Sequence, residues 1–143
     1  MFSIKTHREL PRHISATEDP DWIIGSPPCT GFSIMGRSNH RRMGPEVMRK
    51  RINEGRRHLQ FCTKLYRDHL ERGNHFLHEP PEGASSWKEE CIEWILNHSQ
   101  VVTVVGDICQ YGMKIEMIPH VILPVKKATR WMSSSSRMLN LLK

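Results

Sequence analysis

Apolar and polar residues form two different patterns along this chain, and these patterns distinguish the expected strands from the expected helices. Short runs rich in β-branched and aromatic residues end at Gly, Pro or Ser, as strands often do. Two longer stretches repeat their apolar residues with the period of a helix that buries one face. Ser86 and Glu89 have the capping-box spacing expected at the start of the second helix. The strands are expected at 21–25, 75–79, 101–105 and 126–133, and the helices at 45–72 and 86–98.

The first of these helices has the clearest boundaries. Pro45 occupies its first turn, where a missing backbone N–H has little consequence, and Gly73 follows its last turn, a position that favours glycine. The apolar stripe includes Leu59, Cys62 and Leu65, and the opposite side carries Arg and Lys, which we interpret as solvated charges. Cys62 is therefore expected to be an inert core residue.

The order strand, helix, strand, helix, strand is typical of a doubly wound α/β sheet with parallel strands. Residues 101–105 form a continuous β-branched run, as in a strand buried on both faces. Residues 134–136 are serines that can cap a short terminal helix, and residues 1–20 show little periodicity and form an irregular segment. We therefore expect one partial α/β domain over residues 21–143.

Composition narrows the class of protein only slightly. The chain has 143 residues and a formal net charge of +6, which permits a polyanionic partner. No apolar run approaches the ~20 residues of a membrane span, and no apolar segment follows the first charges, so we expect an intracellular protein, cytoplasmic or nuclear. The cysteines are too widely spaced for a disulfide framework or a common zinc site; they are Cys29, Cys62, Cys91 and Cys109.

One of these cysteines stands in a distinctive loop. The strand from Asp21 ends at Gly25, and Pro27 and Pro28 then impose a stiff, non-helical path before Cys29. The thiol is therefore expected just past the carboxyl end of a strand, the edge at which α/β sheets bind ligands. A cysteine held there is suited to nucleophilic attack. The alternative is a buried structural cysteine in a proline-rich turn.

Glu79 ends the second strand in a similar manner and is followed by Pro80 and Pro81. A carboxyl group at this place is suited to hydrogen-bond the Watson–Crick edge of an extruded base, and the alternative is a solvated carboxylate. His78 alternates with Glu79 along the strand, so we expect it on the opposite face and in a structural role. Cys29 and Glu79 thus form the candidate catalytic site.

The run Gly25-Ser26-Pro27-Pro28-Cys29, followed by Phe32-Ser33, resembles the catalytic loop of the DNA cytosine-5 methyltransferases. The resemblance implies that Cys29 attacks C6 of a flipped cytosine and that Glu79 hydrogen-bonds N3 of the base. It also implies that the methyl group comes from S-adenosylmethionine. The His78-Glu79-x-Pro81 variant is similar to methyltransferase-like segments of phages and retroelements. The residues expected to shape the loop are Pro27, Pro28, Thr30, Phe32 and Ser33.

The resemblance covers residues 21–136 and implies the second half of a Rossmann-like class I methyltransferase fold. The family's Glu-Asn-Val is replaced by Glu79-Pro80-Pro81, and its Gln-x-Arg-x-Arg does not follow Tyr111-Gly112. Only about 20 residues precede the first strand, too few for the βα units that bind S-adenosylmethionine in the family. Methyl transfer is therefore expected to depend on a missing N-terminal half, in one polypeptide or in trans.

Basic residues near these loops are the expected contacts with double-stranded DNA. They are Arg37, Arg41, Arg42, Lys126, Lys127 and Arg130. Two alternatives remain open: a degenerate, non-catalytic domain that binds nucleic acid or a partner, and a plain α/β domain with structural or metal-held cysteines. A sheet that lacks its first strands exposes an unpaired edge, so we also expect self-association.

Overall fold

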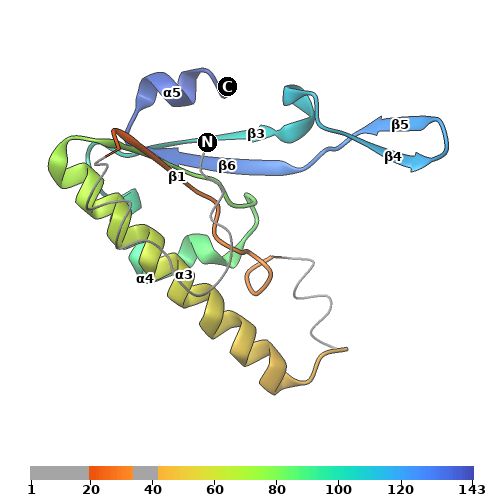
Figure 1. Ribbon diagram of the computed structural model, residues 1–143, viewed down its shortest axis with the longest axis horizontal. Helices are drawn as coiled ribbons and strands as arrows, with labels where there is room; N and C mark the ends of the chain where they lie inside the picture. The colour runs from red at the N-terminus through yellow and green to blue at the C-terminus, as the bar shows by residue number, and fades with distance from the viewer. Residues whose placement is uncertain (1–19, 34–41) are drawn as a thin grey trace.

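The computed structural model describes residues 20–33 and 42–143, whose arrangement is shown in Figure 1. The main sheet contains β1 (Trp22–Gly25), β2 (His75–His78), β3 (Val102–Asp107) and β6 (Ala128–Ser133). A separate hairpin consists of β4 (Lys114–Ile118) and β5 (Val121–Pro124). The helices are α3 (Pro45–Arg72), α4 (Glu90–Leu96) and α5 (Ser136–Asn140), with the 3-10 turns η2 (Ser85–Lys88) and η3 (Ile108–Tyr111). The predictions for residues 1–19, Arg37 and Arg41 lie outside the described residues.

The main sheet is mixed, with strand order β1-β2-β6-β3. β1 and β2 are parallel, and β6 is antiparallel to both of its neighbours, β2 and β3. The first three strands therefore run in one direction, as the order of elements predicts. The expectation of a parallel, doubly wound sheet is wrong at β6, because the chain returns from β3 to β6 without a crossover helix. A parallel neighbour requires such a crossover, whereas an antiparallel one does not.

α3 and α4 lie on one face of this sheet, and α5 lies on the other (Figure 1). Both crossovers, through α3 and through α4, move across the sheet in the same direction. Because such crossovers are right-handed, both helices are placed on the same face. Among the described residues only the short α5 covers the second face, so the sheet is not wound equally on both sides. The core between sheet and helices includes Leu59, Tyr66, Phe76, Ile92, Ile95 and Met132.

α3 confirms the boundaries predicted from the sequence. It begins at Pro45 and ends at Arg72, and Gly73 adopts the left-handed conformation with a φ of 75°. Its charged positions make it too polar for a lipid bilayer, and no helix in the described part of the chain is long and apolar enough to cross a membrane. The terminal helix is also confirmed, since the Met138 N–H donates to the Ser135 hydroxyl at 3.3 Å at its start.

Two predictions for the second half of the chain are wrong. β3 forms an edge of the sheet with β6 as its strand partner, and it is not buried on both faces. Val102 is 39% and Val105 50% exposed. The single helix expected at 86–98 is instead η2 followed by α4, since Glu89 between them has an extended backbone. No side chain caps either element, so the capping box is not formed.

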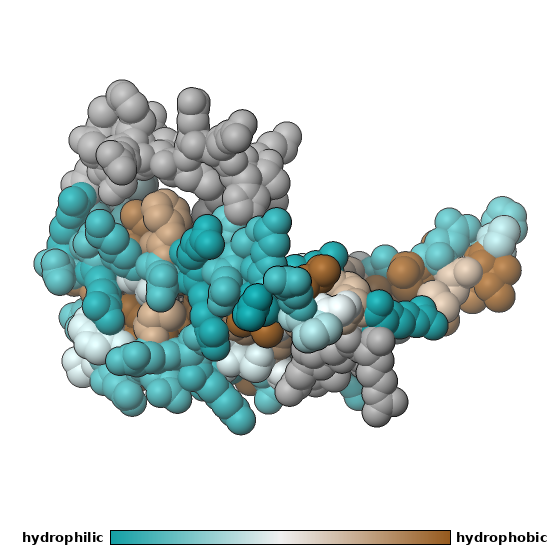
Figure 2. Space-filling model, turned by 90° about the horizontal axis from the view of Figure 1, so that it is seen from below, coloured by the Kyte–Doolittle hydropathy of each residue, from teal (hydrophilic) through white to brown (hydrophobic). Residues whose placement is uncertain are grey.

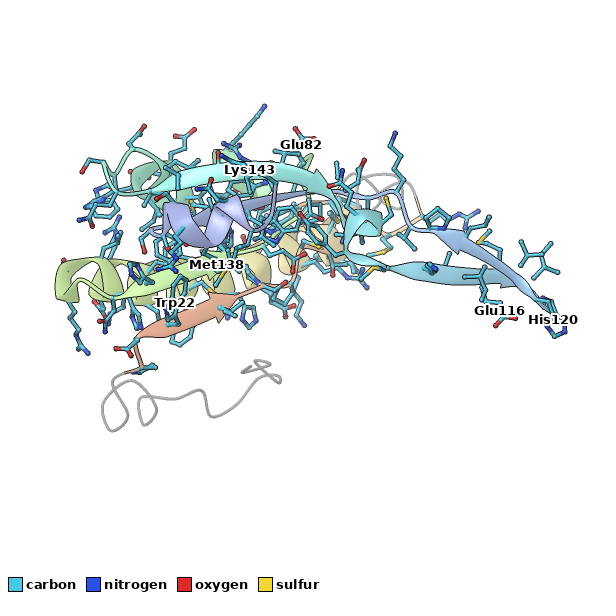
Figure 3. The ribbon with its side chains drawn as sticks, turned by 90° about the horizontal axis from the view of Figure 1, so that it is seen from above. Trp22, Glu82, Glu116, His120, Met138 and Lys143 are labelled. Carbon is cyan, nitrogen blue, oxygen red and sulfur yellow. The ribbon has the colours of Figure 1, made fainter. Side chains whose placement is uncertain are left out.

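The hairpin of β4 and β5 projects from the main sheet as an arm (Figures 1 and 3), in a segment where the sequence predicted no element. All residues of its two strands are exposed. Ile115 pairs with Leu123, and Ile118 pairs with Val121, so these four side chains lie on one apolar face. Apolar side chains follow the arm in Figure 2. His120 forms the turn with a φ of 72°.

Candidate functional site

β1 and β2 bring the two candidate loops to one edge of the sheet. Gly25 and His78 are partners in the parallel register, so the loops begin at Ser26 and Glu79. The Glu79 N–H donates to the Gly25 carbonyl oxygen at 3.1 Å, and the Ser26 hydroxyl donates to the Glu79 carbonyl oxygen at 3.3 Å. The loops that carry Cys29 and Glu79 therefore begin side by side at the carboxyl ends of adjacent parallel strands.

Cys29 begins a tight turn within its loop. Its carbonyl oxygen accepts hydrogen bonds from the Phe32 N–H at 2.9 Å and from the Ser33 N–H at 2.8 Å. Cys29 is half-buried and lies outside the hydrophobic core, whereas Phe32 is 3% exposed and belongs to that core. Phe32 thus anchors the loop, and the Cys29 thiol is not sealed in packed hydrocarbon. Of the other residues expected to shape the loop, Pro27 is half-buried, and Pro28 and Thr30 are exposed.

Two glycines allow this loop to pack closely on α3. A Cβ at Gly31 would lie 3.2 Å from the α3 backbone, and a Cβ at Gly55 would lie 2.7 Å from the Phe32 ring. On its other side, the Phe32 carbonyl oxygen accepts hydrogen bonds from the Ser85 N–H at 2.9 Å and from the Ser85 hydroxyl at 3.3 Å. The Cys29 loop is therefore held between the first half of α3 and the start of η2.

A buried tyrosine–histidine pair lies beneath the strand ends. Tyr66 Oη and His78 Nδ1 are 2.9 Å apart, and a Cβ at Gly25 would overlap the Tyr66 oxygen. Burial lowers the pKa of His78 to about 3, so its ring is neutral at neutral pH. Burial likewise raises the pKa of Tyr66 well above its usual value. The pair is therefore a structural support for the site, as expected for His78, and not an acid–base pair at neutral pH.

The loop after Glu79 is attached to β6 and η2. The Arg130 N–H donates to the Pro80 carbonyl oxygen at 3.2 Å, and Trp87 Nε1 donates to the Pro81 carbonyl oxygen at 3.0 Å. The Arg130 guanidinium lies 4.5 Å from the centre of the Trp87 ring. Arg130 thus packs on an aromatic ring next to this loop, and the half-buried Glu79 stands at the start of a segment held by backbone hydrogen bonds.

The other basic residues expected to contact DNA lie in two segments of the described chain. Arg42 is exposed just before α3, at the end of the chain segment that follows the Cys29 loop. Lys126 and Lys127 are exposed between the hairpin and β6. The structure therefore leaves these three cations accessible.

The remaining cysteines show no sign of a metal centre. In residues 20–33 and 42–143, no group of three or more His, Cys, Asp or Glu side chains is placed to hold a metal ion. Cys62 is buried in the core, and burial raises the pKa of its thiol to about 11. Its side chain is therefore protonated at neutral pH, in agreement with the inert role predicted for it.

Sequence reasoning missed several residues that fix the site, namely Gly55, Tyr66, Ser85 and Trp87. Only Gly55 left a signal, because a glycine in the interior of a helix is unfavourable and indicates close approach of another group. The roles of Tyr66 and Trp87 depend on partners outside their own elements, at His78 in β2 and at Pro81 in the loop before η2. No local pattern identifies such partners.

Comparisons with protein-family models, curated proteins and solved structures found no match for the chain. The residues and their geometry are therefore the basis on which a function is assigned.

Proposed function

We propose that this chain is the base-handling half of a DNA cytosine-5 methyltransferase-like domain, with Cys29 as the nucleophile and Glu79 as the partner of N3 of the base. One observation carries the proposal: the loops of Cys29 and Glu79 leave adjacent parallel strands together, joined by the bond from the Glu79 N–H to the Gly25 carbonyl oxygen. The carboxyl edge of such strands is where α/β sheets bind ligands.

The arrangement of elements also supports the proposal. Three strands of one direction, β1, β2 and β3, are joined by helices, and β6 completes the sheet. This partly parallel sheet with flanking helices supports the comparison with the second half of a class I methyltransferase fold. Cys29 and Glu79 follow the two strands after which the resemblance places them.

The proposed chemistry is a reversible addition to a cytosine turned out of the duplex. The Cys29 thiol gives its proton to water, its sulfur forms a bond to C6, and the π electrons of the C5–C6 bond move to C5. Glu79, as the carboxylic acid, donates a hydrogen bond to N3 and so stabilises the negative charge that develops on the ring. C5 then takes a proton from water. Loss of the original C5 proton and departure of the thiolate restore cytosine.

Methyl transfer needs a donor site in addition to these residues. By the resemblance, S-adenosylmethionine binds at a Gly-rich turn after a strand that precedes β1 along the chain. In the described part of the chain β1 is an edge strand with no strand beyond it, so these residues do not fit the cofactor. We therefore assign the handling of the base, and not the binding of the donor, to the described residues.

Exchange of the cytosine C5 proton with solvent deuterium tests the addition without any methyl donor. The chain is incubated with duplex DNA in deuterated buffer, and the nucleosides are analysed by mass spectrometry. We expect exchange that is abolished in Cys29→Ser and reduced by about 10²-fold in Glu79→Gln. Cys91→Ser, at another half-buried cysteine, is the matched control and retains exchange. Exchange that survives in Cys29→Ser contradicts the proposed nucleophile.

A second function, nucleic-acid or partner binding without chemistry, is favoured by one observation. The residues after Glu79 are prolines whose carbonyl oxygens are engaged by Arg130 and Trp87, an arrangement that the family's Glu-Asn-Val does not lead us to expect. Salt-dependent DNA binding that is unchanged in Cys29→Ser, with no deuterium exchange in the unmodified chain, would establish this second function over the first.

A further inference from the structure

The first half of α3 carries an unusual concentration of positive charge. Residues 49–57 contain five cations and one carboxylate, a net charge of +4, although the whole chain carries only +6. All five cationic residues are exposed. They are Arg49, Lys50, Arg51, Arg56 and Arg57.

Among the residues that the structure describes, three of these cations have no carboxylate partner. Arg49 is 3.4 Å from Glu46, and Arg56 is 3.0 Å from Glu89. Lys50, Arg51 and Arg57 have no ion-pair partner among the described residues. Lys50 and Arg57 are two helical turns apart and point away from the core, which α3 contacts through Met48, Gly55 and Leu59. Their charges are thus available to an external anion.

This basic segment is also the part of α3 on which the Cys29 loop rests. Gly31 approaches the backbone of Arg51 and Ile52, and Phe32 contacts Gly55. The beginning of α3 extends past the sheet (Figure 1), and its exposed residues include Arg49, Lys50 and Arg51. A polyanion attracted to residues 49–57 would therefore lie next to the loop that holds the candidate nucleophile.

The chemistry of α3 selects the kind of polyanion. A helix that binds a lipid surface inserts an apolar face into the bilayer. The apolar face of α3 is instead packed on the sheet through Leu59, Cys62 and Tyr66. Residues 49–57 span about 12 Å of helix axis, a length that passes about three or four phosphates of one DNA strand. Val47, just before this segment, is the one exposed large apolar residue of α3, so the exposed side offers mainly charge, which suits a phosphate backbone.

We propose that residues 49–57 of α3 form a phosphate-binding surface for duplex DNA that positions the duplex beside the Cys29 loop. The choice of DNA rests on the proposed function, whereas the surface itself is tested by affinity alone. Phosphate contacts of this kind fix the position of the duplex and carry no base specificity. Lys64, an exposed lysine in the second half of α3, lies on the same side of the helix about 10 Å beyond Arg57 and marks where the surface is expected to end.

Fluorescence anisotropy with a short labelled duplex, titrated at several salt concentrations, tests the surface. We expect Lys50→Glu, Arg51→Glu and Arg57→Glu each to weaken binding by about tenfold and to lower the slope of log K against log salt by about 1. Lys64→Glu makes the same change of charge on the same helix and is expected to alter the affinity by less than about twofold. Circular dichroism checks that each variant is folded.

Four results would overturn the surface or its occupant. These are equal weakening by Lys64→Glu, no weakening by the three variants, tighter binding to single-stranded RNA than to the duplex, or binding to phosphatidylserine vesicles that DNA does not displace. The surface and the proposed function fail separately. If the variants weaken binding but the unmodified chain shows no C5 exchange, the surface stands and the Cys29 chemistry is wrong. If exchange occurs and the variants do not weaken DNA binding, the surface is wrong.

Discussion

Replacing Gly25 with alanine tests whether the Tyr66–His78 pair supports the strand ends that carry the two loops. A methyl group at this position would overlap the Tyr66 hydroxyl oxygen and lie 3.0 Å from Tyr66 Cζ. Tyr66 is 1% exposed, and its ring is stacked on Phe76 with the ring centres 4.4 Å apart. The tyrosine therefore has little room to move away from an added methyl group.

Two terms set the size of the effect. Forcing a methyl group into a packed core costs about 1–3 kcal/mol. If Tyr66 turns aside, it loses its hydrogen bond with His78, and leaving that buried ring nitrogen unpaired costs about 1–3 kcal/mol more. We expect Gly25→Ala to lower the free energy of unfolding by about 2–6 kcal/mol, a large part of the ~5–15 kcal/mol available to a domain.

Urea denaturation followed by circular dichroism measures this loss, and a double-mutant cycle identifies its cause. Tyr66→Phe removes the overlapping oxygen, so Gly25→Ala should cost at least about 1 kcal/mol less in that background. Gly44→Ser is the control, because no atom lies within 4 Å of a Cβ at Gly44 and serine is a favourable residue before α3. A loss below about 0.5 kcal/mol, or the same loss in both backgrounds, would refute the reasoning.

Three further predictions concern pH, thiol reactivity and association. Because burial lowers the pKa of His78 from 6.5 to about 3, the unfolded chain binds more protons than the folded chain between these pH values. The free energy of unfolding should therefore fall by about 1.4 kcal/mol per pH unit below 6.5. Urea denaturation at several pH values should show a weaker dependence in His78→Gln, and an unchanged dependence contradicts the prediction. Iodoacetamide at neutral pH should label Cys29 at least about 10²-fold faster than the buried Cys62, as measured by peptide mass spectrometry. The difference should disappear when urea unfolds the chain. Equal rates in the folded chain would show that Cys62 is accessible and contradict the prediction. The double variant Ile118→Lys, Val121→Lys should reduce self-association, as measured by analytical sedimentation, because both residues are exposed on the apolar face of the hairpin. Its melting temperature should be unchanged. A fall in melting temperature would show that the arm packs on the domain.

The sequence alone determined the parts of this protein whose signals are local. Pro45 and Gly73 bound α3 because a missing N–H and a left-handed backbone each have one preferred place on a helix. The position of Cys29 past the end of β1 followed from the prolines before it, and the place of Glu79 followed from the apolar run that it ends. In each case the residue and its neighbours in the chain carry the whole physical cause.

The tertiary structure decided which segments became neighbours. The β-branched run at 101–105 identified a strand but not its partner, and it became an exposed edge because β6 took the place between it and β2. The arm at 114–124 likewise depends on pairing across a turn that the sequence did not reveal. Gly25, Tyr66 and His78 meet only after β1 and β2 are paired and α3 is packed on them. Strand partners, exposed edges and buried polar pairs depend on contacts between residues of different segments. The composition and periodicity of one segment do not determine those contacts.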